Sequence, residues 1–285
     1  MKRIKKLFSI KFYIELLSKN WFNLPETIFI NFYFLPFKQA IKLPIWIYGN
    51  VRFIKLNDKI KIEATKVSTK MIVINRTNES ACNSNGNTEI ILNSGTLLFK
   101  GKAQIGCGCR ILIYNNGEIV FGENFKMNNQ NSLSSCNKLQ FENMVVLGHQ
   151  NQIYDTDFHF CATQEGYVHN SSKPVLLGAY TFIGNRVTIT KGVILPAYTI
   201  VSANSLVNKT LPIESGTIIG GIPAKPLAKD FYRIRNTKIE ASLYEYFKKH
   251  PEEKLFKLDD PFEMWTAYSG GYPFSISVDI RSVPS

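Results

Sequence analysis

The chain has 285 residues, 45% of them hydrophobic, and a formal net charge of +12 at pH 7. This composition is sufficient for a buried core, and the length allows one large domain or two modest ones. The longest apolar run, Thr27–Phe37, is well short of the about 20 residues that span a bilayer, and no nucleic-acid recognition motif accompanies the charge, so we expect neither a membrane-spanning helix nor a nucleic-acid partner.

The N-terminal segment, residues 1–60, carries most of the positive charge. The first 66 residues hold 13 Lys and Arg against four Asp and Glu, and they are rich in aromatic side chains. Short helices are predicted here, because Pro25, Pro36 and Pro44 interrupt any longer pattern. The basic start is similar to a secretion signal, but charged residues interrupt its apolar run and no small-residue cleavage site follows, so secretion is not expected.

Two compatible roles suit this segment. Aromatic residues mixed with basic ones are typical of a surface that lies on anionic lipid. The same aromatic side chains can instead pack on the first coils of a repeat and close its open end, as terminal repeats require. The sequence leaves both roles open.

The strongest pattern is a register of six in the second half of the chain. It places aliphatic residues at Leu177, Ile183, Ile189, Leu195, Val201 and Val207. Small residues recur between them at Thr181, Val187, Val193, Thr199 and Ser205. This period fits neither a helix nor a simple strand, but it fits a chain that turns a corner every six residues. A β-helix with three faces per coil is predicted, with the aliphatic residues inside.

Earlier coils follow the same period less regularly. Three triplets keep the spacing of six: Phe99, Ile105, Ile111; Phe121, Met127, Leu133; and Phe141, Leu147, Ile153. The register slips between triplets, as insertions at corners would cause. The many Asn residues are expected at corners, where Asn tolerates left-handed backbone angles. The predicted β-helix domain spans residues 61–225.

The repeat breaks after Ile153 and resumes at Val175, leaving a polar loop over residues 154–174 that contains Asp155, Asp157 and His159. Loops that leave a rigid scaffold often carry functional residues. An imidazole at such a place can remove a proton from an alcohol near neutral pH. Either Asp could orient the imidazole or simply form a turn.

The C-terminal segment, residues 226–285, is predicted to contain one helix. Thr237 to Glu240 forms a capping box, and Ile239, Leu243 and Phe247 share one face. The helix is expected to end before Pro251.

The stretch Gly178–Lys225 resembles the hexapeptide acyltransferases, similar in particular to galactoside, maltose and polysaccharide O-acetyltransferases. Its run of hexapeptides ends in Gly-Ile-Pro-Ala-Lys, which matches the G-x-P-A-[KR] ending of that family, and the likeness extends over roughly residues 90–225. The resemblance implies a left-handed parallel β-helix, here with a helical N-terminal segment and a C-terminal helical tail. The left hand departs from the usual crossover rule and comes from the family.

The resemblance also implies a reaction, in which an acetyl group passes from acetyl-CoA to a sugar hydroxyl. The family has a catalytic His at this break, so His159 becomes the general base, with Asp157 as its orienting partner and Asp155 as a substrate ligand. Asn128 matches the acceptor-binding Asn of the sugar acetyltransferases, with a corner Asn as the alternative.

Donor-binding residues follow from the same matches. They are Asn185, Ala203, Asn208, Lys209 and Lys225, the lysines being suited to the phosphates of CoA. Three positions depart from the family pattern: Phe182 replaces a Trp, Asn204 a Gly and Asn208 a Thr. In this family the site forms between subunits, so a homotrimer is implied.

No metal is expected. His149, His159 and His169 are spaced by ten, just over half of an 18-residue coil, so they would not stack on one edge. Cys107 and Cys109 have no second pair, and alternating Cys in a half-buried strand is the preferred interpretation. Five irregularly placed Cys indicate a reducing compartment.

The predicted function is O-acetylation of a bacterial surface polysaccharide, capsule or O-antigen, or of its lipid-linked precursor. The predicted location is the cytoplasm, with peripheral contact to the anionic inner face of the cell membrane as an added expectation. Two alternatives remain: an N-acyltransferase acting on an amino-sugar nucleotide, and a non-catalytic β-helix scaffold.

Overall fold

The computed structural model describes residues 21–57, 59–76 and 86–267. Contacts divide the chain into two compact units, Met1–Phe231 and Tyr232–Ser285, and this division falls close to the predicted boundary at residue 225. Among the described residues, no helix combines the length and the apolar composition that crossing a bilayer requires.

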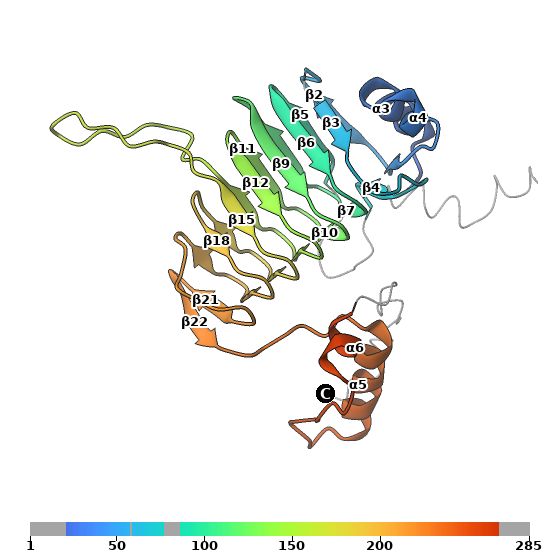
Figure 1. Ribbon diagram of the computed structural model, residues 1–285, viewed down its shortest axis with the longest axis vertical. Helices are drawn as coiled ribbons and strands as arrows, with labels where there is room; N and C mark the ends of the chain where they lie inside the picture. The colour runs from blue at the N-terminus through green and yellow to red at the C-terminus, as the bar shows by residue number, and fades with distance from the viewer. Residues whose placement is uncertain (1–20, 58, 77–85, 268–285) are drawn as a thin grey trace, which may run out of the picture. The chain divides into compact units, whose positions relative to one another are not determined.

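The first unit is a β-helix in which each coil contributes one strand to each of three sheets (Figure 1). The first sheet contains, in spatial order, β1 (Ile45–Ile47), β4 (Ile72–Ile74), β7 (Ala103–Ile105), β10 (Phe125–Met127), β13 (Val146–Leu147), β16 (Phe182–Ile183), β19 (Ile200–Val201), β21 (Ile218–Gly221) and β22 (Ala224–Ala228). All its neighbouring strands are parallel except β21 and β22.

The second sheet contains β2 (Val51–Ile54), β5 (Thr88–Leu92), β8 (Arg110–Ile113), β11 (Ser132–Ser135), β14 (Gln152–Tyr154), β17 (Thr188–Ile189) and β20 (Leu206–Val207). The third contains β18 (Ile194–Leu195), β15 (Val175–Leu177), β12 (Lys138–Phe141), β9 (Gly117–Phe121), β6 (Gly95–Phe99) and β3 (Lys59–Ile62). The predicted left-handed parallel β-helix is confirmed. Its strands begin with β1, earlier in the chain than the predicted domain start at residue 61.

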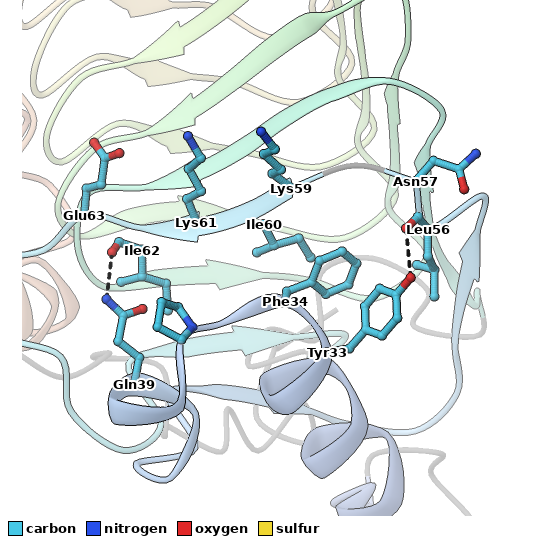
Figure 2. A pocket seen from close by; sticks show the side chains of 11 residues that line it. Tyr33, Phe34, Gln39, Leu56, Asn57, Lys59, Ile60, Lys61, Ile62 and Glu63 are labelled. Atoms are coloured by element: carbon cyan, nitrogen blue, oxygen red, sulfur yellow. Dashed lines mark hydrogen bonds between the residues drawn. The ribbon is translucent and has the colours of Figure 1, made fainter.

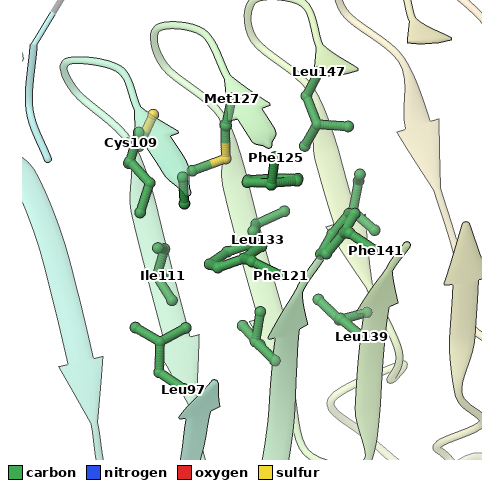
Figure 3. Close-up of a cluster of buried hydrophobic side chains, with 14 of the residues drawn as sticks. Leu97, Cys109, Ile111, Phe121, Phe125, Met127, Leu133, Leu139, Phe141 and Leu147 are labelled. Carbon is green, nitrogen blue, oxygen red and sulfur yellow. The ribbon is translucent and has the colours of Figure 1, made fainter. Parts of the chain in front are cut away.

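The register of six forms the core as predicted. All six aliphatic residues from Leu177 to Val207 are at most 2% exposed, and so are the five small residues between them. The members of the three earlier triplets are also buried. There the core is filled by aromatic rings, with the Phe121 ring centroid 4.2 Å from that of Phe125 and 5.5 Å from that of Phe141 (Figure 3).

The predicted slips all fall at one corner of the prism. From Phe99 onward, the extra residues between triplets lie where the chain passes from the second sheet to the third. The largest insertion there, residues 155–174, leaves the coil as a long arm before β15 (Figure 1). Insertions at a corner leave the strand pairing intact, because the strands before and after them keep their register.

The role of Asn differs from the prediction at several positions. Asn204 does occupy a corner with a positive φ of 56°. Asn131 and Asn151 instead lie buried inside the prism. The Asn131 side-chain oxygen accepts from the Asn151 N–H at 2.9 Å, and that of Asn151 accepts from the Val187 N–H at 2.8 Å. They form a ladder that pairs backbone groups between coils.

Helices α3 (Leu24–Phe34) and α4 (Phe37–Ala40) lie at the N-terminal end of the β-helix, where α3 packs against β1 and β3 (Figure 1). The segment therefore closes the first coil, as one of its two predicted roles requires.

The second unit contains α5 (Thr237–Lys249) and α6 (Phe262–Thr266). The predicted helix is present and ends before Pro251, but its cap is one residue earlier than predicted. The Asn236 side chain accepts from the N–H groups of Lys238 and Ile239 at 3.1 and 3.4 Å. Asn is a preferred N-cap residue, so it takes this position ahead of Thr237.

Candidate active site

The arm, residues 155–174, is a two-stranded excursion from the corner between β14 and β15. Its strands meet through antiparallel bridges at Thr156–Ser172 and Ala162–Val168. The tip turns at Gly166, whose φ of 86° suits a residue without a side chain. Residues 157–170 are all exposed, so the arm is held by its base rather than by a covering layer of this chain.

Asp155 anchors the base of the arm. It is completely buried, and its carboxylate accepts from the Ser135 hydroxyl at 2.7 Å and from the N–H groups of Cys136 and Asn137 at 2.9 and 3.0 Å. These bonds tie the arm to the corner of the preceding coil. Asp155 does not line the His159 pocket, and its role as a substrate ligand stays a prediction.

Aromatic rings fix the next turn of the chain. Phe158 has a positive φ of 62°, and its N–H donates to the Thr156 hydroxyl at 3.0 Å. Its ring lies 6.3 Å from that of Tyr114 and 6.1 Å from that of Tyr154, centroid to centroid. This packing orients the backbone immediately before His159.

His159 lines a cavity of about 410 Å³ between the arm and the neighbouring corner. Seven residues form its wall: Asp157, His159, Cys161, His169, Asn170, Lys173 and Lys191. The cavity therefore brings together the predicted base, a second imidazole from the returning strand of the arm, and two ammonium groups.

Asp157 lines this cavity, but its carboxylate pairs with Lys191. Lys191 also donates to the Asn170 carbonyl at 2.9 Å and is only 21% exposed. Among the contacts of the described residues, Asp157 meets His159 through the backbone, where the His159 N–H donates to the Asp157 carbonyl at 2.7 Å. In this geometry the Asp157 carboxylate contacts Lys191, and its predicted role in orienting the His159 imidazole stays a prediction.

Two lysines of the cavity, Lys173 and Lys191, were not predicted, and they form a column with the predicted Lys209. Lys173, Lys191 and Lys209 are each 18 residues apart, which is one coil. The pairing of β17 with β20 puts Lys191 and Lys209 at the same corner in adjacent coils, and the Gly192 N–H donates to the Lys173 carbonyl at 3.2 Å. A search for the coil period among charged residues would have found it. Three ammonium groups on one corner attract anions.

Three of the other predicted donor residues, Asn185, Ala203 and Lys225, lie away from this corner. Asn185 and Ala203 share the corner between the first and second sheets, where the Asn204 N–H donates to the Asn185 carbonyl at 2.9 Å. The Asn185 side-chain oxygen accepts from the His149 N–H at 2.8 Å. Asn208 adjoins Lys209, and Lys225 lies on β22. All five predicted donor residues are exposed, and none lines the His159 pocket.

Asn128 follows β10 at the same corner as Asn185 and Ala203, in an earlier coil. Its carbonyl accepts from the Asn131 side chain at 2.7 Å. The structure thus gathers the predicted acceptor residue and two donor residues on one corner, and His159 on another. One chain does not join the two groups in a single cavity.

The spaced histidines do not form a metal group. Within the described residues, His250, Glu252 and Glu253 alone place three potential ligand atoms within 4.8 Å of one another, and two of these residues are exposed. Exposed acidic groups of this kind are common without an ion. Cys107 and Cys109 are buried at the corner before β8, which corrects the expectation that they alternate within a strand.

No model of a known protein family matches the chain. A curated relative from Escherichia coli (strain K12), named WbbJ and described as a lipopolysaccharide biosynthesis O-acetyl transferase, is 25% identical over 150 residues, which cover 49% of this chain and 74% of the relative. The predicted resemblance to O-acetyltransferases is confirmed by this match.

Solved structures with partial likeness include three acetyltransferases. The polySia-specific acetyltransferase NeuO is 14% identical with a TM-score of 0.47, covering 73% of this chain and 99% of that one. The hexapeptide-repeat acetyltransferase VCA0836 of Vibrio cholerae O1 biovar eltor, in complex with acetyl-CoA, is 24% identical with a TM-score of 0.35, covering 42% and 64%. A maltose O-acetyltransferase of Clostridium difficile 630 is 27% identical with a TM-score of 0.34, covering 42% and 63%. At these TM-scores, no inference about function is based on the structural likeness.

Proposed function

We propose that the chain is an acetyl-CoA-dependent O-acetyltransferase that acts on a sugar hydroxyl of a bacterial surface polysaccharide or its lipid-linked precursor, with His159 as general base. The observation that carries the proposal is the placing of His159 in a cationic cavity at the break of a hexapeptide β-helix. The match to a lipopolysaccharide biosynthesis O-acetyl transferase supports the acceptor class.

The reaction needs one proton acceptor and good alignment. The acceptor hydroxyl attacks the thioester carbonyl while the His159 imidazole removes its proton, so a carbon–oxygen bond forms as the carbon–sulfur bond breaks. The CoA thiolate leaves and takes up a proton. Holding both substrates together makes a covalent enzyme intermediate unnecessary, because alignment lowers much of the barrier.

The lysine column (Lys173, Lys191 and Lys209) suits a negatively charged substrate group. Lys191 is partly neutralised by Asp157, while Lys173 also lines the cavity. An ammonium group binds phosphate as a point charge, so the phosphates of CoA or an acidic group on the acceptor suit this corner. Lys225, Asn185, Ala203 and Asn208 supply the remaining donor contacts in this proposal.

The site is completed by a second copy of the chain, and the assembly is a homotrimer. Asn185 and Ala203 lie on a different corner from His159, and Lys225 lies on the terminal hairpin, so one chain alone does not enclose both substrates. The exposed arm supports this arrangement: Phe160 and Tyr167 are 71% and 72% exposed, and such rings are typical of an interface that a partner covers. The location proposed with this donor is the cytoplasm.

The test of the reaction is thiol release from acetyl-CoA with a panel of sugars, oligosaccharides and amino-sugar nucleotides. His159→Ala should lower acceptor-dependent release by about 10² to 10⁴. His250→Ala, at a half-exposed His of the second unit, is the matched control and should keep full activity. Release only with amino-sugar nucleotides would favour the N-acyltransferase, and the absence of CoA binding would favour the scaffold.

The shared site is tested by mixing two inactive chains. His159→Ala removes the base, and Ala203→Trp fills the exposed donor corner. If the site lies between copies, co-expressed chains form some interfaces with both native parts and regain activity above either variant alone. If each site lies within one chain, every mixed assembly stays inactive.

A further inference from the structure

The helix that closes the N-terminal end has its polar side turned inward. Strand β1 is the edge of the first sheet, so apart from the Ile47 carbonyl, which accepts from the Asn23 N–H at 2.9 Å, its outer backbone groups have no strand beside them. Asn23, Thr27 and Asn31 are four residues apart and share one face of α3. All three are at most 5% exposed, although they are polar.

These side chains take the place of a neighbouring strand. The Asn31 side-chain oxygen accepts from the Ile45 N–H at 3.1 Å, and its amide donates to the Ile45 carbonyl at 2.7 Å. The Thr27 hydroxyl accepts from the Ile47 N–H at 3.1 Å. The Asn23 amide donates to the Gly49 carbonyl at 2.9 Å. Ile30 is the buried apolar residue of α3, and because polar side chains take up the rest of the inner face, most of its other apolar residues are left on the outside.

The outer face of α3 and α4 is accordingly apolar and exposed. It consists of Leu24, Ile28, Phe29, Phe32, Tyr33, Phe37 and Ile41, which are 44–71% exposed. Rings lie side by side on it, with centroids 5.3 Å apart for Phe29 and Tyr33 and 6.2 Å apart for Phe32 and Phe37. A continuous apolar face of this kind on a water-soluble fold indicates an interaction surface.

Basic residues border this face. Lys38 and Lys42 lie beside Phe37 and Ile41 in the sequence and are exposed. A groove of about 800 Å³ runs between the end of α3 and the edge strand β3, with Phe34 and Ile60 on its floor. Figure 2 shows Lys59 and Lys61 projecting from β3 on the side away from these apolar residues, with Glu63 beyond them.

We propose that the outer face of α3 and α4, with Lys38 and Lys42 beside it, lies on the surface of a bilayer that contains anionic phospholipid. The aromatic rings enter the boundary between headgroups and acyl chains, while the ammonium groups meet lipid phosphates. Charge decides for this occupant: residues 21–66 hold seven Lys and Arg against three Asp and Glu. The 11-residue helix α3 lies on the membrane and does not span it.

This inference deepens the proposed function, because a protein bound to the membrane is brought to a lipid-linked acceptor. It is tested by binding alone, with no acceptor or donor present. A chain that does not bind vesicles could therefore still be a transferase, and a chain that is inactive in the transferase assay could still bind membranes.

The test is flotation of the full chain with vesicles of phosphatidylcholine, with and without about 30 mol% phosphatidylglycerol. The wild-type chain should float with the anionic vesicles, and the bound fraction should fall as salt is raised. Phe29→Gln with Phe32→Gln should weaken partitioning at least about tenfold, because two rings no longer leave water. Both rings are about half exposed, so the folded state keeps its core.

Two further variants complete the test. Lys38→Gln with Lys42→Gln should weaken binding about tenfold to anionic vesicles and leave binding to neutral vesicles unchanged. Tyr244→Gln with Leu255→Gln removes two exposed apolar side chains of the second unit and should change binding less than about twofold.

Three outcomes would overturn the proposal. The first is equal binding of the wild-type chain to neutral and anionic vesicles, or no binding to either. The second is unchanged binding of the Phe29→Gln, Phe32→Gln variant. The third is a smaller assembly of that variant in sedimentation without lipid, which would make the face an interface between copies. Thermal unfolding of each variant verifies that it is folded.

Discussion

The two ends of the β-helix cover their exposed strand edges with different chemistry. At the N-terminal end, side chains of α3 bond to the outer edge of β1, and the helix shows an apolar face to the outside. At the C-terminal end, the backbone folds back as the hairpin β21–β22, and the Thr210 hydroxyl accepts from the Ile194 N–H at 2.9 Å. Exposed strand edges invite unwanted pairing, so both devices protect the fold.

Because the two ends differ in burial, mutations at each end should change different properties. The bonds between the polar face of α3 and β1 are buried, so mutations there should lower the free energy of unfolding. Mutations on the outer face of α3 should instead weaken membrane binding. The C-terminal device is largely exposed, and the residues near it include Lys209 and Lys225. Mutations there should weaken acetyl-CoA binding and leave the free energy of unfolding nearly unaltered.

The largest expected effect is at Asn31. Asn31→Leu leaves the N–H and carbonyl of Ile45 buried without partners, so we expect a loss of about 3 kcal/mol in the free energy of unfolding. Urea unfolding measures it. Phe32→Leu, on the outer face of the same helix, is the control and should cost less than about 0.5 kcal/mol. Equal losses for both variants would mean that the hydrogen bonds of the polar face do not stabilise the N-terminal end.

Lys225 tests the donor role of the other end. Lys225→Gln should raise the KM for acetyl-CoA about fivefold and leave kcat nearly unchanged, because an exposed ammonium contributes about 1 kcal/mol to phosphate binding. Initial rates at varied acetyl-CoA give both constants. Lys229→Gln, an exposed neighbour without a predicted role, should leave KM unaltered. A fall in kcat alone would argue against a donor contact.

Thr210 allows the same test at the C-terminal strand edge, where water has access. Thr210→Val removes the partner of the Ile194 N–H, but both residues are exposed, so water can replace the lost hydroxyl. We expect a loss of only about 0.5 kcal/mol in urea unfolding. A loss as large as that of Asn31→Leu would erase the distinction between the two ends.

Glu26 should show the smallest effect, and it depends on pH. Burial raises the pKa of this carboxyl group, outweighing its hydrogen bonds to the Val51 backbone and the Asn23 side chain. A raised pKa in the folded state favours the protonated form, so the stability contributed by the group is present at low pH and is lost as the pH rises through the folded pKa. Relative to Glu26→Gln, the wild-type chain should therefore melt at a lower temperature at pH 7 than at pH 4. The same difference at both pH values would contradict this account.

Much of the fold was open to prediction because the β-helix is a periodic structure. A period of six identifies the inward residues from Leu177 to Val207, since each coil repeats the same environment. The break after Ile153 likewise identifies the arm and His159. Contacts on the arm could not be predicted: Asp157 meets Lys191 across 34 residues of sequence, and Asp155 turns inward to the preceding coil.

The coil, its three faces and the place where the chain leaves it follow from local spacing along the chain. The tertiary structure alone decided which surface residues become neighbours. It stacked Lys173, Lys191 and Lys209 on one corner, and it turned Thr27 and Asn31 toward β1 so that Phe29 and Phe32 face outward. The physical reason is that an unpaired strand edge needs hydrogen-bonding partners more than a helix needs to bury its apolar face.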